Sequence, residues 1–140
     1  MYETIVVAVD GSDSTEGVLN VVGGLARKLG STVEVVHVHE HDPVPAKAGM
    51  SPDLETPVEA KTMLDGFVEK LRAEGVTANG RLAQAHTRDV AKRIIAEAEA
   101  AHADLIVVGR RGLSSFGEML VGSVSNKLVH LSPIPVLVAK

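Results

Sequence analysis

The chain has 140 residues, of which 45% are hydrophobic and 23% charged, and its formal net charge is −4. This length and composition predict a single globular domain over residues 1–140, while the negative charge argues against nucleic acid or an acidic membrane surface as a partner. The absence of cysteine excludes disulfides, thiolate catalysis and zinc–cysteine sites. Because no apolar run approaches the roughly 20 residues of a membrane span, we expect a cytoplasmic protein.

The first part of the chain predicts a strand, a helix and a second strand. Residues 5–9 form a continuous apolar run, typical of a strand buried on both faces of a parallel sheet. A helix follows, with Asp13 as its expected N-cap and Gly30 as the glycine that ends it. Residues 32–39 are rich in β-branched side chains and predict the second strand. The apolar stripe of the helix consists of Val18, Val22, Leu25 and Leu29.

The middle of the chain predicts a loop, two helices and one strand. Residues 41–57 contain four prolines and scattered acids, which favour an exposed and mobile loop. The first helix ends at Gly75, the polar segment 76–84 suits a strand at a sheet edge, and the second helix begins after Thr87. The two helical stripes consist of Leu64, Phe67, Val68 and Leu71, and of Val90, Ile94, Ile95 and Ala98.

The last third of the chain contains a glycine-rich loop between a strand and a helix. Residues 105–108 form an apolar run, and the following loop has the pattern Gly109-Arg110-Arg111-Gly112, nine residues, then Gly122-Ser123-Val124-Ser125. Glycines let backbone amides approach an anion closely, and a helix that starts at Ser123 adds unpaired N–H donors and a positive dipole end. This pattern predicts phosphate binding. The helix carries Val124, Leu128 and Leu131, and residues 134–139 predict a fifth strand.

The alternation of strands and helices predicts an α/β fold of three layers. We expect an open, parallel, five-stranded sheet of Rossmann-like type with the strand order 3-2-1-4-5. In this order the first and fourth strands are neighbours whose following loops leave in opposite directions, which opens a crevice at their carboxyl ends. Asp10 and Gly109 follow these two strands. Two features distant in sequence are therefore expected at one site.

The chain resembles the universal stress protein family, specifically its ATP-binding branch. The resemblance lies in Ile-Val-Val-Ala-Val-Asp-Gly-Ser at 5–12, Val-Val-His-Val at 35–38, Asp-Leu-Ile-Val-Val-Gly at 104–109, the segment 122–127 and the segment 133–138. The spacing G-x2-G-x9-G-S in this context is specific. The resemblance covers nearly the whole chain.

The resemblance implies a set of ATP-binding residues. Asp10 would lie near the adenine and ribose, Val9 and Val38 would line the base, and Val108 would pack beneath the sugar. The ribose and phosphates would be surrounded by Gly109, Arg110, Arg111, Gly112, Gly122, Ser123, Val124 and Ser125. Ser125 departs from the family, in which alanine or threonine is frequent. A Mg or Mn ion, held through the phosphates with Asp10 nearby, would neutralise the remaining charge. The strand from Pro135 to Ala139 would form a homodimer by edge pairing.

These features favour a nucleotide-dependent sensor or regulator in which ATP orders the loop 110–121 and changes the partner-binding surface of a dimer. Two alternatives stay open: a nucleotide-free dimeric interaction module, and a slow ATPase or autophosphorylating protein. We expect no dedicated enzyme and assign no catalytic residue, because no general base is evident. A response-regulator receiver domain is disfavoured, since Asp10 lacks an acidic neighbour and no acceptor aspartate follows the third strand.

Three histidines alternate at positions 37, 39 and 41, and alternate residues of a strand face the same way. This spacing makes a zinc site conceivable, but no cysteine or carboxylate completes an obvious ligand set. His37 is better interpreted as a sheet residue that is hydrogen-bonded within the fold.

Overall fold

The structure, a computed structural model, describes residues 1–41, 55–110 and 123–140 and contains one five-stranded parallel sheet. The strand order is β3-β2-β1-β4-β5, which confirms the predicted order 3-2-1-4-5. The strands are β1 (Thr4–Val9), β2 (Thr32–Glu40), β3 (Thr77–Ala85), β4 (Leu105–Gly109) and β5 (Val136–Ala139). The polar strand β3 lies at one edge, as expected, and β5 at the other.

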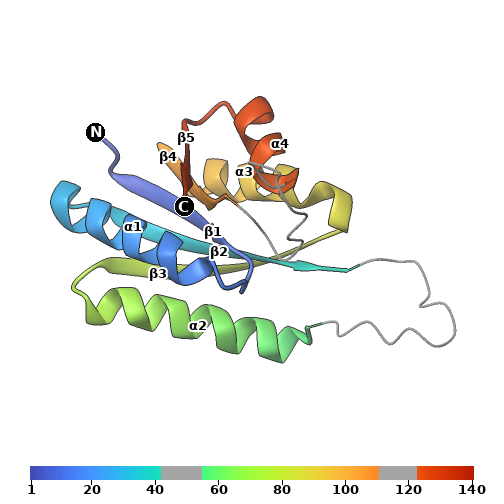
Figure 1. The fold of residues 1–140 in the computed structure, drawn as a ribbon, viewed down its shortest axis with the longest axis horizontal. Coiled ribbons are helices and arrows are strands. Elements are labelled where there is room, and N and C mark those ends of the chain that lie inside the picture. The colour runs from blue at the N-terminus through green and yellow to red at the C-terminus, as the bar shows by residue number, and fades with distance from the viewer. Residues whose placement is uncertain (42–54, 111–122) are drawn as a thin grey trace, which may run out of the picture.

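Helices cover both faces of the sheet, which confirms the three-layer arrangement (Figure 1). Helices α1 and α2 pack on one face, and α3 and α4 pack on the other. The helices are α1 (Thr15–Leu29), α2 (Pro57–Ala73), α3 (Val90–Ala100), which follows a 3₁₀ turn at Thr87–Asp89, and α4 (Ser123–Leu131). In the part of the chain that the structure describes, no helix has the length and apolar character to cross a membrane.

The two faces of the central strands explain their continuous apolar sequences. In β1, Ile5 and Val7 pack under α1 and α2, whereas Val6 lies in the cluster under α3 and α4. All three side chains are fully buried. In β4, Leu105 and Ile106 divide between the same two clusters. A strand covered on both faces gains hydrophobic stabilisation from every residue, so it needs no polar alternation.

The first helix begins later than its sequence suggests. The prediction that Asp13 is the N-cap is wrong, because the first helical residue is Thr15 and the N-cap is Ser14. The turn upstream accounts for the difference: the Ser12 amide donates to the Asp10 carboxylate over 2.9 Å, and the Ser12 carbonyl accepts from the Thr15 amide over 3.0 Å. The predicted end is confirmed, since Gly30 adopts φ +70° and its amide donates to the Ala26 carbonyl.

The predicted loop 41–57 includes the first residue of a helix at its C-terminal end. Residues 42–54 lie outside the described residues, but Pro57 is the first residue of α2 rather than part of a loop. The Thr56 side chain accepts from the Glu59 amide, and the Glu59 carboxylate accepts from the Thr56 amide, which forms a capping box. Proline fits the first helical position because its missing N–H would have no helical partner there.

Two residues assigned to helical stripes are exposed. Leu29 is 47% exposed and Leu131 is 55% exposed, whereas Leu128 is fully buried. Both exposed leucines are the last residues of their helices. The fifth strand also begins at Val136 rather than at residue 134, because the Ile134 amide donates to the Ser132 side chain.

Candidate functional site

The carboxyl ends of β1 and β4 lie side by side at the centre of the sheet. Ala8 of β1 is in register with Val108 of β4, so Asp10 and Gly109 follow two adjacent strands. The neighbouring positions of these two chain ends agree with the crevice expected from the strand order. This edge of the sheet is therefore the candidate functional site.

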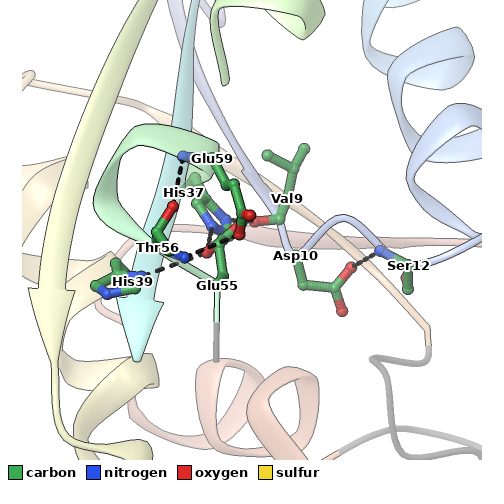
Figure 2. Close-up of polar contacts among 8 residues, drawn as sticks. All are labelled: Val9, Asp10, Ser12, His37, His39, Glu55, Thr56 and Glu59. Carbon is green, nitrogen blue, oxygen red and sulfur yellow. Dashed lines mark hydrogen bonds and ion pairs between the residues drawn. The ribbon is translucent and has the colours of Figure 1, made fainter. Parts of the chain in front are cut away.

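Asp10 shapes the turn between β1 and α1. Its Oδ1 atom accepts hydrogen bonds from the Ser12 amide at 2.9 Å and from the Thr15 hydroxyl at 3.3 Å, as Figure 2 shows for Ser12. Gly11 between them adopts φ +79°, a conformation that side chains disfavour. Asp10 itself is exposed. The same carboxylate thus organises the loop and faces solvent at the strand end.

The start of α4 is tied to the end of β4. The buried Ser125 hydroxyl donates to the Gly109 carbonyl, and the Arg110 amide donates to the Ala139 carbonyl over 2.8 Å. Ser123 is exposed and Val124 is half-buried at the first turn of α4. The hydrogen bond from Ser125 therefore brings together two ends of the glycine-rich loop. The intervening residues with predicted roles, Arg111, Gly112 and Gly122, lie outside the described residues.

The three valines of the predicted site do not share one face. Val38 and Val108 lie in the cluster under α3 and α4. Val9 lies in the cluster under α1 and α2, where its side chain is 6% exposed. A contact of Val9 with a ligand in the crevice would therefore use its backbone rather than its side chain.

A polar cluster beside the site was not predicted from the sequence. His37 is buried in β2, where its Nδ1 atom lies 2.8 Å from the Val9 carbonyl oxygen and its Nε2 atom 2.8 Å from Glu55 Oε2 (Figure 2). His39 Nδ1 lies 3.4 Å from the same Glu55 oxygen. The expectation that His37 is hydrogen-bonded within the fold is confirmed. The Thr56–Glu59 capping box was the available sequence signal that a helix starts directly after Glu55.

Glu40, at the end of β2, adds another carboxylate to this cluster. Although the residue is exposed overall, partial desolvation raises the pKa of its carboxyl group. The negative charges of Asp10 and Glu55 also raise the pKa of Glu40, while His37 opposes this shift. Several acidic groups thus share a small region at the carboxyl ends of β1 and β2.

The alternating histidines do not converge on a common ligand position. His37 and His39 contact Glu55, whereas the ring of His41 packs edge-on against His86 with 4.7 Å between centroids. Over residues 1–41, 55–110 and 123–140, no group of three or more His, Cys, Asp or Glu side chains is arranged to hold a metal ion.

Comparison with known proteins gives consistent matches over the whole chain. The model of the "Universal stress protein family" matches residues 1–140. A Thermus aquaticus protein, "Universal stress protein in QAH/OAS sulfhydrylase 3'region", is 36% identical over 146 residues, with all of both chains covered.

Two solved structures have nucleotides in their descriptions. The structure of the universal stress protein from Archaeoglobus fulgidus in complex with dAMP has a TM-score of 0.71 and 31% identity, covering 99% of this chain and 98% of that one. A universal stress protein in complex with cAMP has a TM-score of 0.73 and 25% identity, covering 99% of this chain and 97% of that one.

Proposed function

Because the chain belongs to the universal stress protein family, we propose that it binds ATP together with Mg²⁺ or Mn²⁺ and acts as a nucleotide-dependent sensor or regulator in the cytoplasm. One observation supports this proposal most strongly. Asp10 follows β1, and the neighbouring strand β4 ends at Gly109, whose carbonyl accepts a hydrogen bond from Ser125 at the start of α4. Two related structures, described with dAMP and with cAMP, both hold adenine nucleotides.

In this proposal each part of the crevice contacts a different part of ATP. Asp10 lies near the adenine and ribose, Val38 and Val108 supply apolar contact, and Val9 contributes its backbone. Backbone amides at the start of α4 bind the phosphates, where the helix dipole favours negative charge. The residues proposed to surround the ribose and phosphates are Gly109, Arg110, Arg111, Gly112, Gly122, Ser123, Val124 and Ser125. Since the described residues form no metal site of their own, the cation would be held mainly by the phosphates.

The test of nucleotide binding is calorimetric titration of the purified protein with ATP and Mg²⁺. We expect heat release and a raised melting temperature, because a ligand that binds only the folded state stabilises it. GTP serves as the control for recognition of the base. If ATP gives neither heat nor thermal stabilisation, the nucleotide-free interaction module becomes the better hypothesis. Release of inorganic phosphate during the same incubation would instead favour the slow ATPase. Transfer of a labelled phosphoryl group from ATP to the protein would favour the autophosphorylating protein.

We further propose that β5 pairs with β5 of a second copy to form a homodimer. An edge strand has backbone groups available for pairing, and in β5 the Leu137 side chain is 37% exposed. We expect a dimeric mass in light scattering at micromolar concentration, and a monomeric mass after Leu137→Lys, which places a charge in the interface. The control is Val58→Lys, at a 75% exposed position of α2. A monomeric mass of the unmodified protein contradicts the proposal.

A further inference from the structure

His37 connects two segments that border the proposed site. Its side chain is 5% exposed and lies between the end of β1 and the residue that precedes the α2 cap (Figure 2). On one side the ring contacts the carbonyl of Val9, the residue directly before Asp10. On the other side it contacts Glu55, which precedes the capping residue Thr56. The ring therefore joins segments that are 28 and 18 residues from it in the sequence.

The partners of the two ring nitrogens determine where protons must lie. A carbonyl oxygen only accepts, so Nδ1 must donate its proton to Val9. Nε2 of a neutral ring would then present a lone pair to the Glu55 carboxylate, which also only accepts. A hydrogen bond over the observed 2.8 Å therefore requires one additional proton between Nε2 and Oε2.

Acidic groups from several segments lie around this bridge. Glu55 precedes α2 and contacts the ring, and Glu40, at the end of β2, interacts electrostatically with His37, Asp10 and Glu55. His39, also on β2, contacts the same Glu55 oxygen at the longer distance of 3.4 Å. On β3, the residue in register with His37 is the apolar Leu82. An imidazolium in these surroundings makes two charge-assisted contacts at 2.8 Å.

We propose that His37 and Glu55 form a proton-bearing bridge that holds the Val9–Asp10 end of β1, so that nucleotide affinity falls when the bridge loses its proton. The proposal rests on the proposed nucleotide function and assigns a pH-dependent regulation to that site. His37 is a positioning residue in it, because it acts through the Val9 backbone and the adjoining Asp10.

The decisive variant is Glu55→Gln. The glutamine amide can donate to the lone pair of a neutral His37 ring, which restores the bridge without the additional proton. ATP affinity is measured by calorimetry at about pH 6 and about pH 8.5, the range over which imidazole ordinarily changes charge. When the pH rises from about 6 to about 8.5, the dissociation constant of the unmodified protein for ATP should increase about tenfold more than that of Glu55→Gln. A factor of about ten corresponds to the loss of one charge-assisted contact. Titration of ATP itself is common to both proteins and cancels in the comparison.

Two control variants separate the bridge from its acidic surroundings. Glu59→Gln lies in the first turn of α2, and Glu40→Gln removes the neighbouring carboxylate at the end of β2. Both variants are expected to retain a loss of ATP affinity between about pH 6 and about pH 8.5. Equal pH dependence in Glu55→Gln and the unmodified protein would overturn the proposal. So would a loss of the pH dependence in either control.

A second measurement examines the bridge without nucleotide. In NMR spectra at about pH 6, both ring N–H protons of His37 should give resolved signals, because both are hydrogen-bonded, and only the Nδ1 proton should persist at about pH 8.5. The exposed His102 provides an internal reference without such signals. Absence of the Nε2 proton signal at about pH 6 overturns the bridge. If no variant binds ATP at either pH, the affinity claim and the proposed function fail, while these signals still determine whether the bridge exists.

Discussion

Replacing Leu128 with alanine is expected to lower the free energy of unfolding by about 2–5 kcal/mol, the range for leucine deletions in well-packed cores. Leu128 is fully buried in the cluster between α3, α4 and the sheet. Truncation removes its transfer free energy and leaves a cavity, because its neighbours on two layers cannot all move inward. The effect is measured by urea denaturation at fixed protein concentration.

The chain provides a matched control one turn later in the same helix. Leu131 is 55% exposed, so Leu131→Ala should change the unfolding free energy by no more than about 0.5 kcal/mol. Both variants remove the same atoms and have the same helix propensity. Equal destabilisation by the two substitutions would contradict the packing of α4 described above.

Replacing Asp10 with alanine is expected to weaken ATP binding by about 10-fold to 100-fold, as for removal of hydrogen bonds to a charged group. The loss has two physical sources. The variant removes the carboxylate proposed to lie near the ribose, and it leaves the Ser12 amide and the Thr15 hydroxyl without their observed acceptor. The dissociation constants are compared by calorimetry with saturating Mg²⁺.

Two further variants distinguish these sources. Asp10→Asn keeps a carbonyl oxygen that can accept from Ser12, so it tests the charge while preserving the turn. Asp13→Ala removes an exposed acidic group three residues away and should leave the affinity within about twofold, since interactions between exposed charges contribute little. An unchanged affinity in Asp10→Ala would exclude this residue from the binding site.

The resemblance and the glycine pattern predicted more than local structure. They led to the family assignment, which the match over residues 1–140 confirms. The individual binding roles stay predictions, including those of Arg111, Gly112 and Gly122. For Ser125, the structure adds a hydrogen bond to Gly109 that the loop spacing could not reveal, because it joins a helix to a strand.

The strands, the helices and the order of the strands in the sheet could be predicted from the amino-acid sequence alone. Residues 5–9 and 105–108 are apolar throughout because both of their faces are covered, and Gly30 ends α1 because its φ is +70°. Such features depend on neighbours within a few residues or on a repeated period. They can therefore be recognised in one dimension.

The side chains that the sheet brings together could be identified only in the folded chain. Leu29 and Leu131 satisfy the helical period yet lie beyond the layer that would bury them. Glu55 meets His37 because α2 begins beside the end of β2, and the Asp10 carboxylate moves the start of α1 past Asp13. Periodicity specifies which face of an element is apolar, but where two elements end against each other depends on packing between residues far apart in the chain.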